Sequence, residues 1–249
     1  MTEQQAINKV LNLARSEIGY KEKRSNAYLN DKTANAGSGN WTKYAHDLDA
    51  VTDFYNGAKN GWPWCDVFVD WLFYKSFGKD EAMKILCQPT HSMGAGCLYS
   101  AGYYKNNGRW STTPHEGDQI FFSYSPGEVS HTGIVEQVSG NKVITIEGNS
   151  SDQVARRSYT IGSSSIYGYG RPRWQYATGP VVDTDEPEAE TKPSGGQAYV
   201  PVIGVMRKGT SGEAVRQLQE NLIKLGYSCG PDGADGDYGP NTVKAVKQF

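Results

Sequence analysis

The sequence lacks several features that mark common classes of protein. Its 25 basic and 27 acidic residues leave a net charge of −2, so no excess of positive charge favours nucleic acid as a partner. It contains no run of about 20 apolar residues, the length that a membrane-spanning helix needs. The amino-terminal segment has no basic start, apolar run or small-residue cleavage site, and we therefore expect no signal peptide.

Cysteine is also scarce. The four cysteines include no CxxC pair, so the sequence predicts neither a disulfide scaffold nor a zinc site. A disulfide between Cys87 and Cys97 is one interpretation of these two residues. Buried free thiols are favoured, because cysteine is among the most buried residue types.

The length of 249 residues allows two domains, since single domains usually contain about 100 to 200 residues. Residues 177–200 are rich in proline, glycine and acidic side chains and lack apolar periodicity, which is typical of a linker. In residues 1–176 helical patterns precede strand patterns, the order expected of an α+β domain. Residues 201–249 contain two helical patterns, which predict a small all-α module.

The best-defined element of the first domain is a helix predicted over residues 64–77. Its sequence, WCDVFVDWLFYKSF, is apolar almost all round, and Gly78 follows as a C-cap, so we expect a buried central helix. Later segments are rich in β-branched and aromatic residues and are bounded by turn residues. They predict an antiparallel sheet packed against this helix, with strands at residues 119–122, 131–138, 142–149, 154–159 and 165–172.

Cys65 stands at the predicted start of the central helix, directly after Pro63 and Trp64. The unpaired N–H groups and the dipole at a helix amino terminus stabilise a thiolate, which is the reactive form of cysteine. Pro63 supports this placement, because proline is favoured at the first turn of a helix. A lone cysteine on an apolar helix is more often an inert buried thiol, so the interpretation needs a partner for Cys65.

A predicted hairpin supplies that partner. Its strands are HTGIVEQV and KVITIEGN, joined by a Ser-Gly-Asn loop that pairs Val138 with Lys142. This register places His131 opposite Asn149 and diagonal to Glu147, with all three on one face. We therefore predict His131 as the base for a nucleophilic Cys65, with Glu147 or Asn149 orienting its imidazole. A two-residue loop would turn His131 to the other face.

The order WCDVFVDW, SHTGIVEQV and IEGN resembles the CHAP family (cysteine, histidine-dependent amidohydrolase/peptidase) from about Ile18 to Trp174. The resemblance implies a papain-like fold and cleavage of amide bonds in bacterial peptidoglycan. It also implies a catalytic set, which consists of Cys65, His131, Glu147 and Asn149. The related NlpC/P60 group usually has a second histidine as the orienting residue, where this sequence has an acidic or amide side chain.

Two groups of residues near Cys65 have alternative interpretations. The aromatic rings of Trp62 and Trp64 are candidates for lining a substrate groove, with core packing as the equal or better alternative. Some CHAP enzymes bind calcium before the nucleophile, where this chain has Asp47, Asp49 and Asp53. Their spacing matches no recognised calcium loop, so a solvated acidic face is favoured and no cofactor is expected.

The sequence RKGTSGEAVRQLQENLIKLGY, followed by DGDYGPNTVKAVKQF, resembles the PG_binding_1 peptidoglycan-binding module from about Val205 onward. The resemblance ends at Phe249, inside the last helix, so we expect a shortened module. Together the two resemblances predict a monomeric cell-wall lytic enzyme, made in the cytoplasm and released at lysis like a phage or prophage endolysin. An N-acetylmuramoyl-L-alanine amidase is favoured; the alternatives are an endopeptidase and a non-catalytic wall-binding protein.

Overall fold

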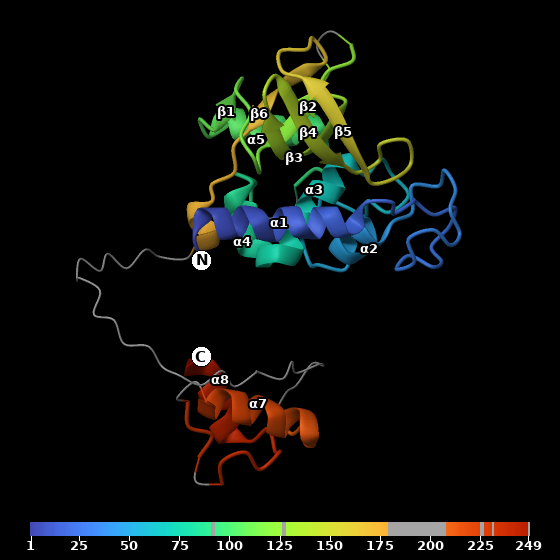
Figure 1. The fold of residues 1–249 in the computed structure, drawn as a ribbon. Helices are drawn as coiled ribbons and strands as arrows, with labels where there is room; N and C mark the ends of the chain where they lie inside the picture. Colours follow the sequence, from blue (N-terminus) through green and yellow to red (C-terminus); the bar gives the residue numbers. More distant parts are fainter. Residues whose placement is uncertain (91–92, 126–127, 179–207, 225–226, 231, 249) are drawn as a thin grey trace, which may run out of the picture. The chain divides into compact units, whose positions relative to one another are not determined.

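The computed structural model describes residues 1–90, 93–125, 128–178, 208–224, 227–230 and 232–248 (Figure 1). The chain divides into two compact units, Met1–Thr184 and Asp185–Phe249. Most of the predicted linker, residues 179–200, lies outside the described residues. Within the described ranges, no helix combines the length and the apolar character that spanning a membrane requires.

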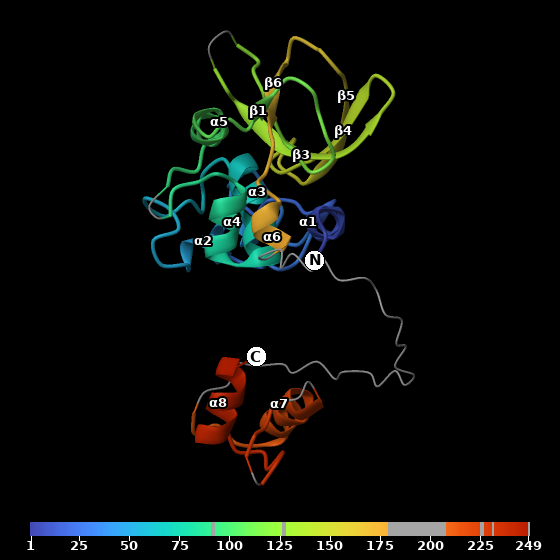
Figure 2. The same ribbon diagram turned by 90° about the vertical axis from the view of Figure 1, so that its left-hand side faces the viewer.

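The first unit contains a layer of helices on one side of a sheet, as both views show (Figures 1 and 2). Its first helix begins at a capping box, in which the Thr2 hydroxyl accepts from the Gln5 N–H and the Gln5 side chain accepts from the Thr2 N–H. The helices are α1 (Glu3–Glu17), α2 (Lys43–Asp49), α3 (Cys65–Phe77), α4 (Lys79–Ile85), α5 (Cys97–Asn106) and α6 (Gln175–Thr178).

Helix α3 is the central helix that the sequence predicted. It packs against α1, α2, α4 and α5 and against strands β3 (His131–Ser139) and β4 (Lys142–Glu147). Ten of its residues are buried, because it has neighbours on nearly every side. The amino terminus of α3 is thereby held at the sheet, beside the strand that starts with His131.

The strands form one antiparallel sheet in the order β1-β6-β2-β3-β4-β5, and Figure 2 shows that this sheet is strongly curled. The remaining strands are β1 (Trp110–Ser111), β2 (Gln119–Phe122), β5 (Ala155–Thr160) and β6 (Ile166–Gly170). Side chains of Phe121, Ile134 and Ile146 join the core shared with the helices. Helices followed by an antiparallel sheet confirm the predicted α+β class.

The turn of the β3–β4 hairpin differs from the prediction. Ser139 pairs with Lys142, so the loop consists of Gly140 and Asn141 alone. Gly140 adopts a φ of 58°, which glycine tolerates without strain, and this suits a tight two-residue hairpin turn. A two-residue loop on its own would shift the whole register by one residue.

A β-bulge corrects that shift further along the same hairpin. The register changes between Val135 and Gln137, which leaves Glu136 as an extra residue in β3. Beyond it Ile134 pairs with Ile146, which is the register that the three-residue loop was expected to give. The Glu136 carboxylate is paired with two arginines, at 2.7 Å and 2.5 Å, and these are Arg15 of α1 and Arg156 of β5.

The second unit contains α7 (Glu213–Lys224) and α8 (Pro240–Gln248). Its apolar core includes Leu222, Cys229 and Ala245. The buried side chain of Gln219 on α7 forms hydrogen bonds with the loop between the two helices. Its Nε2 donates to Asp235 at 2.7 Å and its Oε1 accepts from the Gly236 N–H at 2.7 Å. These bonds satisfy both ends of a buried amide, which would otherwise destabilise the fold.

Candidate active site

Cys65 is the first residue of α3, as the sequence predicted, and Trp64 is the N-cap. Cys65 is 8% exposed and belongs to the buried core. The N–H of Asp66 donates to the sulfur, which is the contribution expected from a helix amino terminus.

His131 is the first residue of β3 and contacts Glu147, the last residue of β4. Its Nε2 lies 2.9 Å from Oε2 of Glu147, whose side chain is 1% exposed. The hydroxyl of Thr145 donates to the other carboxylate oxygen at 2.5 Å. Since Nε2 is bound to Glu147, the ring nitrogen that remains for Cys65 is Nδ1. The geometry is therefore that of a nucleophile, a base and an orienting acid.

The charges of this group favour a thiolate beside an imidazolium. The hydrogen bond from Cys97 has the largest effect and lowers the pKa of Cys65. Burial raises this pKa, whereas the hydrogen bond and the charge of His131 lower it. The resulting pKa lies well below the ordinary value. Burial on its own would lower the pKa of His131. Hydrogen bonds to Cys65 and Glu147 outweigh that effect and raise the pKa to about 9. Both shifts favour the ionised pair, a thiolate beside an imidazolium.

Cys97 is a member of the site that the sequence analysis missed. It is the first residue of α5, and its sulfur lies 3.6 Å from the sulfur of Cys65. The bond to Cys65, followed by burial, raises the pKa of Cys97 well above the ordinary value, so Cys97 stays protonated and donates. The two cysteines are far apart in sequence, and no local pattern links them.

Asn149 does not take the place predicted for it. Strand β4 ends at Glu147, and Asn149 adopts a φ of 53°, so the alternation of a strand no longer fixes its direction. Its Nδ2 donates to Oδ1 of Asn40 at 3.3 Å. The strand alternation on which the prediction for Asn149 rested therefore stops before this residue, and Glu147 is the residue that binds the imidazole.

The two candidates for the orienting role can be separated by substitution. In Glu147→Gln the side chain keeps its size but loses its charge, and a hydrogen bond to a charged group is stronger than a neutral one by about 1 to 1.5 kcal/mol. We expect about a tenfold loss of kcat in a wall-clearing assay. Asn149→Ala should lose less, because its amide contacts Asn40. A complete loss in Asn149→Ala with none in Glu147→Gln would reverse these roles.

Gly133 leaves room for the Glu147 side chain. A Cβ at Gly133 would lie 2.5 Å from Cγ of Glu147 and 2.9 Å from the carbonyl oxygen of Ile146. We expect Gly133→Ala to displace Glu147 and to lower the free energy of unfolding by about 1 to 3 kcal/mol. Thermal unfolding and wall clearing measure the two effects. Gly102→Ala is the control, because a Cβ there meets nothing within 4 Å; equal behaviour of the two variants would contradict the expectation.

The two tryptophans near Cys65 have different surroundings. Trp64 is 0% exposed and its Nε1 donates to Glu22 at 2.8 Å, so it belongs to the core and the prediction that it binds substrate is wrong. Trp62 is 66% exposed. It lines a groove of about 400 Å³ together with Pro63, Ala95, Tyr99, Lys59, Asn56, Ala58 and Gly94. Pro63 lies two residues before Cys65, and Ala95 lies two residues before Cys97.

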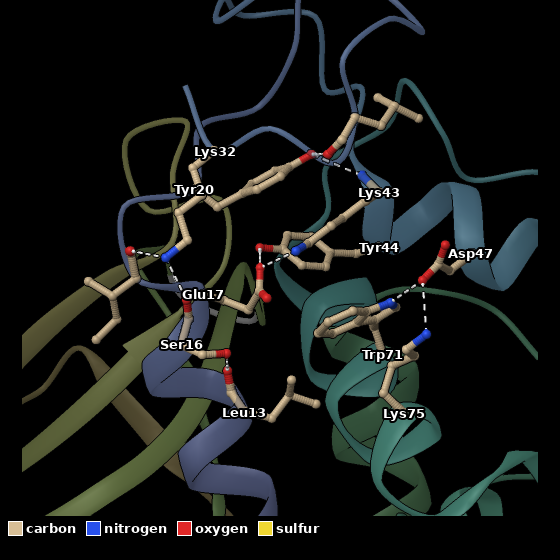
Figure 3. A network of polar contacts seen from close by, with 12 residues as sticks. Leu13, Ser16, Glu17, Tyr20, Lys32, Lys43, Tyr44, Asp47, Trp71 and Lys75 are labelled. Atoms are coloured by element: carbon tan, nitrogen blue, oxygen red, sulfur yellow. Dashed lines mark hydrogen bonds and ion pairs between the residues drawn. The ribbon is translucent and has the colours of Figure 1, made fainter. Parts of the chain in front are cut away.

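Two of the three aspartates considered for calcium, Asp47 and Asp49, have partners within the protein. Figure 3 shows the Asp47 carboxylate beside Trp71 and Lys75, and it accepts from the Trp71 Nε1 at 2.9 Å. The Asp49 carboxylate accepts from two backbone N–H groups, those of Lys59 and Asn60. No group of three or more acidic, histidine or cysteine side chains able to hold a metal occurs in the part of the chain that the structure describes. The carboxylates of Asp47 and Asp49 therefore bind other groups of the protein.

Comparison with known proteins agrees with this geometry. Residues 57–149, which include Cys65, His131 and Glu147, match the CHAP domain family. The chain contains a CHAP domain. Residues 211–249 match PG_binding_1, a peptidoglycan binding domain family. Both family resemblances drawn from the sequence are confirmed.

The curated relatives match short parts of the chain. It is 41% identical over 59 residues to the N-acetylmuramoyl-L-alanine amidase CwlL of Bacillus licheniformis, 24% of this chain and 16% of that protein. It is 51% identical over 43 residues to the type VI secretion system spike protein VgrG3 of Vibrio cholerae, 17% of this chain and 4% of that protein. The crystal structure of Ly7917 is similar with a TM-score of 0.38 and 16% identity, over 67% of this chain and 62% of that one.

Proposed function

We propose that this chain hydrolyses amide bonds of bacterial peptidoglycan with Cys65 as the nucleophile. The observation that carries the proposal is the arrangement of Cys65, His131 and Glu147, in which a stabilised thiolate contacts an imidazole held by a buried carboxylate. The CHAP domain and the peptidoglycan binding domain in one chain support the choice of substrate.

In the proposed reaction the Cys65 thiolate attacks the carbonyl carbon of the amide. The first N–H groups of a helix have no acceptor inside it, so the N–H of Cys65 is a candidate donor to the oxyanion that forms. The imidazolium of His131 then gives its proton to the departing amine, and a thioester remains. His131, now neutral, takes a proton from water, which attacks the thioester and releases the acid and the thiolate. Glu147 orients the ring throughout and stabilises its charge.

The groove beside Trp62 is the candidate site for the peptidoglycan strand. Trp62 and Tyr99 expose 66% and 58% of their surface, and flat aromatic rings pack well against sugar and peptide faces. Nζ of Lys59 donates to Oδ1 of Asn56 at 2.6 Å in the same groove. We propose that residues 211–249 hold the enzyme to the wall while this groove binds the strand, and that release at cell lysis brings both domains to their substrate.

Among the amide bonds of peptidoglycan we propose the one between N-acetylmuramic acid and L-alanine. The choice rests on the resemblance to the CHAP family, and a 59-residue part of the chain is also similar to the amidase CwlL. Digestion of purified peptidoglycan followed by mass spectrometry tests it, with Cys65→Ala as the blank. An amidase frees L-alanine amino termini and leaves glycan without peptide. Shortened stems that remain on muramic acid would indicate an endopeptidase. The absence of any product would indicate a non-catalytic wall-binding protein.

A further inference from the structure

Two cysteines face each other in the candidate active site. Cys65 and Cys97 are the first residues of α3 and α5, and their sulfurs lie 3.6 Å apart. They are 8% and 7% exposed, so both residues keep a small area open to solvent. The hydrolysis proposed above uses the sulfur of Cys65 alone, and the nearness of a second thiol has no part in it.

The two sulfurs differ in chemical character, as the two steps of disulfide formation require. The lowered pKa of Cys65 favours the thiolate, which is the form that peroxides oxidise, and the raised pKa of Cys97 favours a protonated thiol beside it. Burial raises the pKa of the other two cysteines, Cys87 and Cys229, which favours their unreactive thiol form. Oxidation is therefore directed to Cys65, with a resolving thiol in contact.

We propose that Cys65 and Cys97 form a reversible disulfide when the protein meets a hydroperoxide, and that this disulfide switches the nucleophile off and protects it from irreversible oxidation. The switching of activity rests on the hydrolytic function proposed above, whereas formation of the bond does not. Closing the gap to a bond length of about 2.05 Å requires the sulfurs to approach by roughly 1.5 Å. Rotation of the two side chains, each in the first turn of its helix, supplies this movement.

The chemistry balances with a hydroperoxide as the oxidant. The Cys65 thiolate attacks one peroxide oxygen, the O–O bond breaks, and the departing oxygen takes a proton to leave as an alcohol or water. Cys65 is then a sulfenic acid. Cys97 loses its proton and attacks the Cys65 sulfur, the S–S bond forms, and the displaced hydroxide takes up that proton as water. Overall the two thiols lose two electrons and two protons, and the peroxide is reduced.

Thiol counting on the full chain tests the proposal without any substrate. The protein is treated with hydrogen peroxide, unfolded in N-ethylmaleimide and measured by intact mass and peptide mapping. We expect two of the four thiols to be lost, a peptide linked between Cys65 and Cys97, and recovery of both thiols and of lytic activity with dithiothreitol. Retention of all four thiols, or linkage of any other pair, would overturn the proposal.

Two variants distinguish disulfide formation between Cys65 and Cys97 from general oxidation of the cysteines. Cys97→Ser has no resolving thiol, so its Cys65 should proceed to sulfinic acid, and dithiothreitol should restore much less of its own untreated activity than in the wild type. Cys87→Ser is the matched control and should behave like the wild type, because Cys87 has no part in the pair. Equal recovery in Cys97→Ser and the wild type would refute the protective role. Absence of lysis by the untreated wild type would count against the proposed hydrolysis, not against the disulfide.

Discussion

Cys65→Ala should abolish the clearing of cell-wall suspensions while leaving a folded protein that still sediments with walls. The expected loss of kcat is on the order of 10⁴-fold or more, because no other group can form the thioester. Cys65→Ser should be nearly as inactive, since a serine hydroxyl at this position remains protonated where a thiol ionises. Turbidity measures lysis, and co-sedimentation measures binding to the wall.

The fold of the Cys65 variants needs its own control. The small side chain of Cys65 is buried, so alanine removes little apolar area and thermal unfolding should change only slightly. Cys87→Ala removes a thiol of similar burial that has no role in the proposed reaction, and it should keep wild-type activity. Lysis by Cys65→Ala at a rate near that of the wild type would refute the nucleophilic role.

His131→Ala should lose activity by about 10⁴-fold, because it removes both the partner of the thiolate and the proton donor to the amine. In the wild type, activity should fall as pH rises through about 9, where the imidazolium loses its proton. The raised pKa of His131 also stabilises the fold. This contribution is complete below the ordinary histidine value of 6.5 and is lost as pH rises through about 9.

The rate of alkylation of Cys65 by iodoacetamide separates a chemical from a structural effect of His131. The wild type should react well below the ordinary thiol pKa, whereas His131→Ala should react only at higher pH, because the thiolate has lost its counter-charge. His46→Ala is the control, since that side chain is 56% exposed and pairs with Asp47. An unchanged pH dependence of alkylation in His131→Ala would contradict a shared mechanism. So would a double variant, Cys65→Ala with His131→Ala, whose lytic activity is far lower than that of either single variant.

The sequence by itself determined the central helix and five strands of the first domain, together with the places of Cys65 and His131 in them. An all-round apolar segment predicts a buried helix, a short stretch before it predicts where that helix begins, and alternating residues predict strands. These are local properties, so the sequence could predict both Cys65 at a helix start and His131 at a strand start. The α+β class follows from the order of the same segments.

Only the tertiary structure decided how these elements meet. The residue in the bulge, Glu136, pairs with two arginines from other elements, and without the bulge the two-residue turn would send His131 to the wrong face. The backbone leaves the β conformation after β4, so Asn149 turns to Asn40. Cys97 reaches Cys65 through the packing of α5 beside α3. Each of these contacts joins residues distant in sequence, and the periodicity of a single segment carries no information about its partners in space.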